Sequence, residues 1–138
     1  MTILDGSLEV DAPARAAYEQ WLRIQEFPGF TEIVEQVDRI DAARSLWKVN
    51  VGGRREWWEA ETTEVIPEKR IAWRSRTGSV HSGVVNFHPL SEETCLVTLH
   101  LQYAPRGLLE RLGDEMGVVD RLVQRFLDQF GRLVESGA

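Results

Sequence analysis

Side chains that can move a proton lie on two of the stretches that this sequence predicts to be strands. Thr62 and Glu64 share one face of a predicted strand in the middle of the chain, and Tyr103 ends the last predicted strand. A carboxylate shielded from water can act as a general base, and hydroxyl groups can hold or relay a proton at hydrogen-bond range. We therefore expect Glu64, Tyr103 and Thr62 to be the candidate catalytic residues, although Glu64, close to a turn at Pro67, can equally be a carboxylate at the rim. Further polar residues expected to face inward are Ser75, Thr77, Arg54 and Glu56.

Other common chemistries lack their sequence signals. The histidines, His81, His88 and His100, lie on or beside adjacent predicted strands, but no acidic residue is spaced to complete a metal site with them. Cys95 sits in an apolar strand, which is typical of a small buried hydrophobic residue. The glycines form no phosphate-binding loop, and no nucleophile-elbow motif occurs. We expect neither a bound metal nor a cofactor.

The composition is that of one ordinary globular domain. The chain has 138 residues, 43% of them hydrophobic, and a formal net charge of −6. This length suits a single domain spanning residues 1–138. The negative charge argues against a nucleic-acid partner, which needs a basic face to neutralise its phosphates. The first residues lack a signal-peptide pattern and no apolar run is long enough to span a bilayer, so we expect a cytoplasmic protein without membrane insertion.

The strongest periodic pattern is the last stretch, Val118 to Val134. Its apolar residues recur at the three-then-four spacing of one helical face, and polar residues occupy the opposite face. An isolated helix of this length is marginal, so its stability must come mainly from packing of the apolar face. We expect it to lie on the strand-rich middle of the chain through Val119, Leu122, Val123, Phe126, Leu127, Phe130, Leu133 and Val134.

The rest of the chain alternates between strand patterns and turns. A short strand leads into a helix that Asp11 is expected to cap, and a second helical segment follows at 24–30. A shorter helical lead is expected at 107–116, ahead of the long helix. Strands are expected at 7–10, 34–40, 44–51, 70–77 and 95–103, with one more on each side of 70–77.

Two turns set the faces of the central strands. Gly52-Gly53 predicts a tight hairpin that places Trp47 opposite Trp58 on the inner face and leaves Trp57 outside. After the turn at Gly78-Ser79, a two-residue loop would point Val84 inward, whereas the apolar pattern favours Gly83, Val85 and Phe87. We follow the apolar pattern and expect a longer loop.

The order of elements is a strand, two short helices, six strands and a long terminal helix. Local motifs accompany it: Glu9-Val10-Asp11-Ala12-Pro13, Phe27-Pro28, Val65-Ile66-Pro67, Arg70-Ile71-Ala72-Trp73, Val85-Asn86-Phe87-His88-Pro89-Leu90 and Val97-Thr98-Leu99. Together they resemble the polyketide cyclase/dehydrase branch of the START-like (SRPBCC) superfamily over nearly the whole chain. The resemblance implies an α+β helix-grip fold, in which a curved antiparallel seven-stranded sheet wraps around the long C-terminal helix.

The resemblance also implies an apolar cavity between sheet and helix, which other members use for lipids, quinones or polyketide intermediates. The inward residues predicted here are aromatic and apolar with a few hydroxyl groups, as in pockets for small hydrophobic molecules. The same set can also be a filled core, because a sequence does not show whether its centre is empty. The expected ligand-binding residues are Phe30, Trp47, Trp58, Thr62, Trp73, Ser75, Phe87, Leu99, Leu101, Tyr103, Met116, Val119 and Val123.

Three functions are compatible with these features. The leading hypothesis is binding of a small hydrophobic molecule such as a lipid, a quinone or a polyketide-like compound, by a monomer or homodimer. The second is a polyketide aromatase/cyclase or dehydrase, which must hold an enolate oxygen and shuttle a proton. Ala60 and Thr62 stand where such enzymes can carry an inward arginine. The third is a protein-interaction module built on the outward Trp57 beside Arg55.

Overall fold

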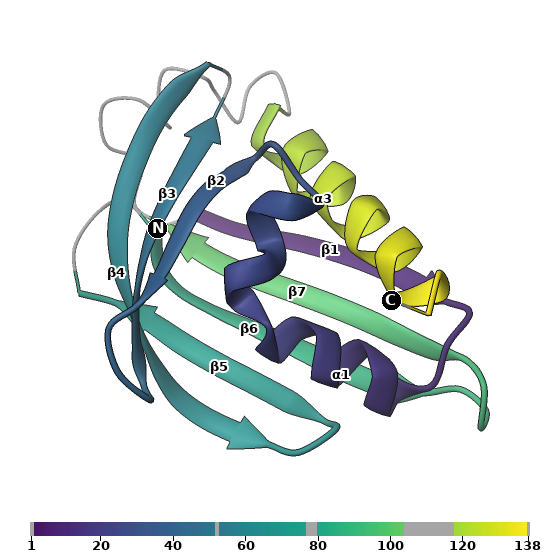
Figure 1. The fold of residues 1–138 in the computed structure, drawn as a ribbon. Coiled ribbons are helices and arrows are strands. Elements are labelled where there is room, and N and C mark those ends of the chain that lie inside the picture. Colours follow the sequence, from purple (N-terminus) through teal and green to yellow (C-terminus); the bar gives the residue numbers. More distant parts are fainter. Residues whose placement is uncertain (1, 52, 77–79, 104–117, 138) are drawn as a thin grey trace.

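In the computed structural model, the described part of the chain is residues 2–51, 53–76, 80–103 and 118–137. It forms one curved antiparallel sheet of seven strands, with helices over one face (Figure 1). Across the sheet the strand order is β1-β7-β6-β5-β4-β3-β2. The predicted helix-grip fold is thereby confirmed. The elements are β1 (Thr2–Val10), α1 (Ala14–Leu22), η1 (Ile24–Gly29), β2 (Val34–Arg39), β3 (Arg44–Val51), β4 (Arg54–Ile66), β5 (Arg70–Ser75), β6 (Val80–Pro89), β7 (Cys95–Tyr103) and α3 (Val118–Glu135).

Most predicted elements are present, but the expected start of the first helix is wrong. Pro13 is the N-cap residue of α1, in an extended conformation, and no side chain caps the helix. The backbone N–H of Asp11 instead donates a hydrogen bond to the Glu135 carboxylate, at 2.9 Å, which links the chain before α1 to the end of α3. The helical lead expected at 107–116 lies outside the described residues.

Helix α3 lies against β1 through the apolar face that its periodicity predicts. Its buried side chains are Val123, Phe126, Leu127, Phe130 and Val134. The approach is close because Gly6, on β1, has no side chain: a Cβ there would lie 2.8 Å from Cδ1 of Leu127. A glycine on the strand thus sets how closely the helix packs.

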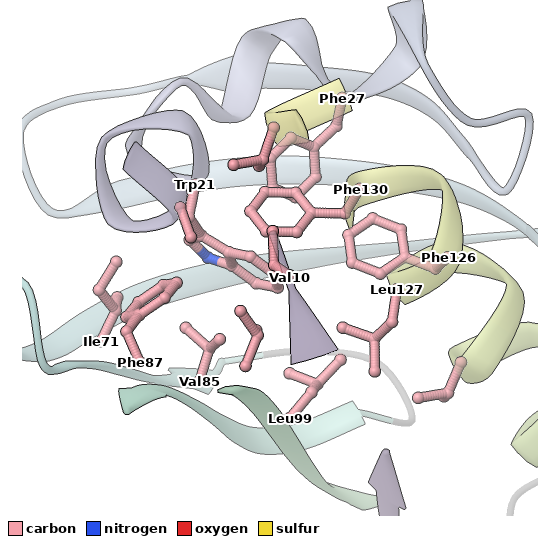
Figure 2. Close-up of a cluster of buried hydrophobic side chains, with 14 of the residues drawn as sticks. Val10, Trp21, Phe27, Ile71, Val85, Phe87, Leu99, Phe126, Leu127 and Phe130 are labelled. Carbon is pink, nitrogen blue, oxygen red and sulfur yellow. The ribbon is translucent and has the colours of Figure 1, made fainter. Parts of the chain in front are cut away.

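Aromatic rings fill the core between α1, η1 and α3 (Figure 2). The indole of Trp21 meets Phe27, Phe126 and Phe130 edge to face, with ring centroids 5.4, 5.7 and 5.3 Å apart. Edge-to-face pairs at this separation are the favoured geometry for aromatic side chains. Trp21 therefore joins the short helix to the long one.

The register of the β3–β4 hairpin is as predicted, but the pairing of β4 with β5 contains a shift that was not predicted. Val51 pairs with Arg54 and Trp47 with Trp58. On β4 the pairing with β5 shifts between Thr62 and Glu64, which is a β-bulge. On β6 the buried residues are Gly83, Val85 and Phe87, so the apolar pattern gave the right face. Trp73 pairs with Gly83, one residue away from the register of a two-residue loop.

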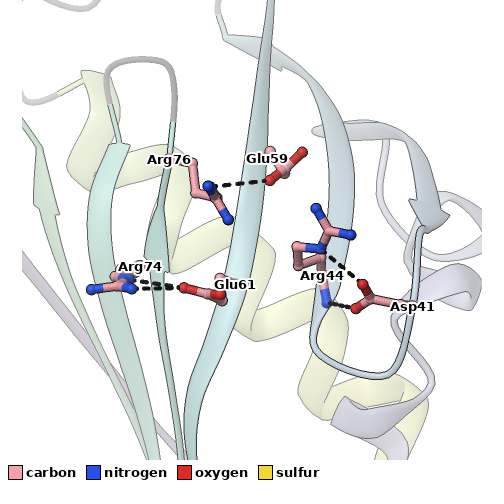
Figure 3. Close-up of polar contacts among 6 residues, drawn as sticks. All are labelled: Asp41, Arg44, Glu59, Glu61, Arg74 and Arg76. Carbon is pink, nitrogen blue, oxygen red and sulfur yellow. Dashed lines mark hydrogen bonds and ion pairs between the residues drawn. The ribbon is translucent and has the colours of Figure 1, made fainter.

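The outer face of β3, β4 and β5 carries paired charges (Figure 3). Glu61 forms an ion pair with Arg74 at 2.9 Å, and Glu59 forms one with Arg76 at 3.5 Å. Arg74 and Arg76 therefore face outward beside Glu61 and Glu59. Exposed pairs of this kind contribute only about 0.2–1 kcal/mol each, so the sheet is held mainly by its inner face.

Candidate ligand cavity

A cavity of about 280 Å³ lies between the inner face of the sheet and the helices. Strands β1, β2, β3, β4, β5 and β7 form its floor, and α1, η1 and α3 cover it. Most of its lining is apolar, as in sites that bind small hydrophobic molecules. The lining residues are Leu4, Trp21, Leu22, Ile24, Phe27, Ile33, Val34, Arg39, Ala42, Ser45, Trp47, Val49, Glu56, Trp58, Ala60, Thr62, Val65, Ile71, Trp73, Leu99, Leu101, Leu122, Val123 and Phe126.

Tryptophan rings form the largest flat surfaces of this lining. Trp47 and Trp58, register partners on β3 and β4, stack with centroids 6.3 Å apart and planes 5° from parallel. Trp73 stacks on Trp21 at 6.2 Å and lies directly over Gly83, which leaves room for the indole. The hairpin register and one glycine therefore hold three of these rings against the cavity.

The cavity opens where α1 ends and β2, β3 and β4 meet. Leu22 and Val65 line it and are 40% and 45% exposed, so this side reaches solvent. Thr62 and Arg39 are exposed lining residues in the same region. We call this opening the mouth and define it by these four residues.

Few polar side chains line the cavity. Ser45 is buried, and its Oγ accepts a hydrogen bond from Nε1 of Trp47 at 2.8 Å. At the mouth, Nη2 of Arg39 donates a hydrogen bond to the Leu22 carbonyl oxygen, at a distance of 3.3 Å. Glu56, half-buried, and Thr62 are the other polar lining residues named above. An apolar cavity with a few polar groups on one side can orient a ligand that has an apolar body and a polar end.

The comparisons with known proteins identify the family. The family model described as "Polyketide cyclase / dehydrase and lipid transport" matches residues 10–130. The chain belongs to this family. An uncharacterized 17.2 kDa protein from the melC2-rnhH intergenic region of Streptomyces lincolnensis is 33% identical over 137 residues, covering 99% of this chain and 91% of that protein.

Solved structures with low identity share the fold of this polyketide cyclase/dehydrase family member. The Zhui aromatase/cyclase from Streptomyces sp. R1128 is 17% identical, with a TM-score of 0.73 and coverage of 99% of this chain and 92% of that one. A START superfamily protein from Mycobacterium smegmatis is 12% identical, with a TM-score of 0.74 and coverage of 97% and 94%. The START-like architecture therefore spans the chain.

The structure places the predicted ligand-binding residues of this family member in three groups. Those that line the cavity are Trp47, Trp58, Thr62, Trp73, Leu99, Leu101 and Val123. Those that do not line it are Phe30, which packs on Phe27; Phe87, which is buried against Trp21; and Ser75, whose buried Oγ has no hydrogen-bond partner. The side chains of Tyr103 and Val119 are not described, and Met116 lies outside the described residues.

The expectation that Glu64 faces inward is wrong. The bulge after Thr62 moves Glu64 to the outer face, opposite Ala72, and brings Val65 into the lining. Glu64 instead forms an ion pair with Arg70 at 2.7 Å, with nearly half of its side chain exposed. A bulge adds one residue to one strand, so every side chain beyond it changes face.

Two polar lining residues were missed by the sequence analysis. Ser45 precedes Trp47 by two residues, so the alternation of β3 could have placed it on the inner face. Arg39 is the last residue of β2, whose pairing with β3 shifts between Val34 and Gln36. Because of this shift, simple alternation along β2 does not predict which face of the sheet Arg39 occupies. Its pairing with Ser45 was therefore decided by the fold.

His88, His100 and Cys95 lie away from the cavity lining, and the side chain of His81 is not described. The ring of His100 contacts the Asp5 carboxylate on the outer side of β1 and β7, and Nε2 of His88 lies 3.5 Å from the Thr98 hydroxyl. In the described ranges no three His, Cys, Asp or Glu residues are grouped to hold a metal ion. Burial raises the pKa of the Cys95 thiol. None of the described helices is long and apolar enough to cross a membrane.

Trp57 is the main exposed aromatic residue on the outer face. It is 46% exposed, and the Lys48 ammonium lies 5.1 Å from its ring centroid. This cation–π contact gives the exposed indole a partner on one of its faces. A protein-interaction role for Trp57 stays a prediction.

Proposed function

We propose that this chain binds a small hydrophobic molecule in the cavity between the sheet and α3. The observation that carries the proposal is an open space of about 280 Å³ walled by tryptophan and aliphatic side chains. Packed protein cores leave few voids larger than a water molecule, so an apolar space of this size with an opening to solvent is unusual for a filled core. Membership of a family described by lipid transport and polyketide chemistry supports the same reading.

The size of the cavity limits the ligand. Ligand pockets usually measure about 300–1,000 Å³, so this one is at the small end. The flat indoles of Trp47, Trp58 and Trp73 favour a planar or near-planar ligand, because rings stack best on rings. A compact molecule of one to a few rings fits this description better than a long-chain lipid.

The test is to fill the cavity from its wall. Ala60 is buried on β4 in the lining, and Ala72, on the neighbouring strand β5, faces the opposite way beside Glu64. Ala60→Phe should place a ring in the cavity, and Ala72→Phe is the matched control with the same substitution on the outer face. Native mass spectrometry for co-purified molecules and quenching of tryptophan fluorescence by hydrophobic probes report binding.

We expect the wild type and Ala72→Phe to bind probes alike, and Ala60→Phe to bind at least about tenfold more weakly because the added ring clashes with the ligand. Circular dichroism melting shows whether Ala60→Phe remains folded. The proposal fails if the folded Ala60→Phe binds as tightly as the wild type, or if the wild type binds no probe and carries no molecule.

A polyketide cyclase or dehydrase activity is the second candidate. It is favoured by the Thr62 hydroxyl and the Glu56 carboxylate, both of which line the cavity. Such a reaction needs a group that takes a proton from an activated methylene and a donor that holds the enolate oxygen. With Glu64 on the outer face, Glu56 is the lining carboxylate available for the first role, and Thr62 for the second.

A further inference from the structure

A row of four residues, three of them polar, crosses the inner face of four adjacent strands. Arg39 on β2 pairs with Ser45 on β3, Ser45 pairs with Ala60 on β4, and Ala60 pairs with Ser75 on β5. Cross-strand partners on one face have their Cβ atoms about 4.5–5.5 Å apart. Arg39 and Ser45 are therefore neighbours on the cavity wall, with the Thr62 hydroxyl one residue pair further along β4.

The Arg39 guanidinium brings an uncompensated positive charge to the mouth. In the part of the chain that the structure describes, Arg39 forms no ion pair, whereas Arg44 on β3 and Arg70 and Arg74 on β5 are each paired with a carboxylate. Its one hydrogen bond goes to the Leu22 carbonyl. A guanidinium has five N–H donors in a planar fork, so most of its donors remain for another partner.

The acidic residues closest to Arg39 in the chain are engaged elsewhere. Asp38 accepts a hydrogen bond from the Gln36 side chain at 2.6 Å. Asp41 accepts bonds from the backbone N–H groups of Ala43 and Arg44 and an ion pair from the Arg44 side chain. These contacts hold both carboxylates to local partners rather than to Arg39.

Ser45 supplies a second polar contact deeper in the cavity. Its Oγ accepts the indole N–H of Trp47, and that indole stacks on Trp58. A hydroxyl that accepts one hydrogen bond can still donate its own hydrogen. Because Ser45 is 7% exposed, an acceptor on a bound ligand would reach it inside the cavity.

We propose that the ligand is a small aromatic carboxylic acid, which binds with its ring among the tryptophans and its carboxylate at the mouth. The carboxylate pairs with the Arg39 guanidinium, and the Ser45 hydroxyl donates to a ligand oxygen. This inference rests on the proposed function and narrows it to one chemical class. Planar carboxylates are the partners that a guanidinium fork recognises best, and an aromatic ring satisfies the apolar part of the lining.

The experiment compares a charged probe with its neutral counterpart. Isothermal titration calorimetry at neutral pH and physiological salt would measure naphthalene-2-carboxylate and naphthalene-2-carboxamide against the wild type, Arg39→Gln and Arg132→Gln. Arg132 is exposed on α3 and is absent from the cavity lining, so Arg132→Gln is the control for the same change of net charge. Thermal melting of each variant checks folding.

The wild type and Arg132→Gln should bind the acid about five- to tenfold more tightly than the amide, the range between an exposed ion pair and a charge-assisted hydrogen bond. In Arg39→Gln that preference should disappear while the amide affinity stays within about twofold. Equal binding of acid and amide by the wild type, or a preference that survives Arg39→Gln, overturns the inference and leaves hydrophobic binding intact. Failure of both probes also overturns it, and the proposed function is then judged by the Ala60→Phe comparison.

Discussion

The contact between Gly83 and Trp73 gives a sharp prediction, because it joins sheet packing to the cavity. A Cβ at Gly83 would lie 2.4 Å from Cζ2 and 2.6 Å from Cε2 of the Trp73 indole, and 2.9 Å from Cδ2 of Leu101, where ordinary contact begins at 3.4 Å. In Gly83→Ala, the Trp73 indole must therefore move by about 1 Å, away from β6 and into the cavity that it lines.

The expected cost follows from two opposing effects. Overpacking of a core position costs typically about 1–3 kcal/mol. Replacing glycine by alanine in a strand returns about 0.4–1 kcal/mol, because the unfolded chain has less freedom to lose. The cavity gives the ring space to move, so we expect a net loss of about 1–2 kcal/mol in the free energy of unfolding. Because the cavity is narrower, the variant should also bind hydrophobic probes more weakly.

Urea denaturation of a double-mutant cycle tests the cause. Trp73→Phe removes the indole Cζ2 that lies closest to the new methyl group, whereas the contact with Cδ2 of Leu101 at 2.9 Å remains, so Gly83→Ala should cost clearly less in that background than in the wild type. Gly29→Ala is the control, because a Cβ there meets nothing within 4 Å, and it should be neutral or stabilising by up to about 1 kcal/mol. An equal loss from Gly83→Ala in both backgrounds would refute the role assigned to Trp73.

Two further predictions concern Glu32 and Thr62. Hydrogen bonds from its own backbone N–H and from the Gln129 side chain, together with Arg125, hold the pKa of Glu32 below its ordinary value. A lowered folded-state pKa contributes stability above the unfolded-state pKa, and this is lost as the pH falls through the folded-state pKa. Glu32→Gln should therefore be less stable than the wild type in urea at neutral pH, with the difference narrowing as the pH falls below the ordinary pKa of a glutamate; a difference independent of pH would contradict this. Thr62→Val should leave probe binding within about twofold, but should lower turnover of a poly-ketone about tenfold or more if the cavity is catalytic. Unchanged turnover would remove Thr62 from the reaction.

The sequence alone was enough for most of the elements and for the register of one hairpin. The Gly52-Gly53 turn fixes the pairing of Trp47 with Trp58, because a tight hairpin leaves the flanking residues one way to pair. The period of the apolar residues likewise fixed the buried face of α3, since a helix presents every third or fourth residue on one side. Both features depend on residues close together in the chain, so the sequence is sufficient to predict them.

The site was decided by the tertiary structure. The bulge after Thr62 reversed the face of Glu64, and the pairing of β2 with β3 brought Arg39 beside Ser45 at the cavity wall. Whether the space among the tryptophans is empty depends on the summed volume of side chains from six strands, β1 to β5 and β7, and from α1, η1 and α3. Alternation assigns a side chain to a face, but a bulge, a strand pairing and an unfilled volume each depend on residues far apart in the chain.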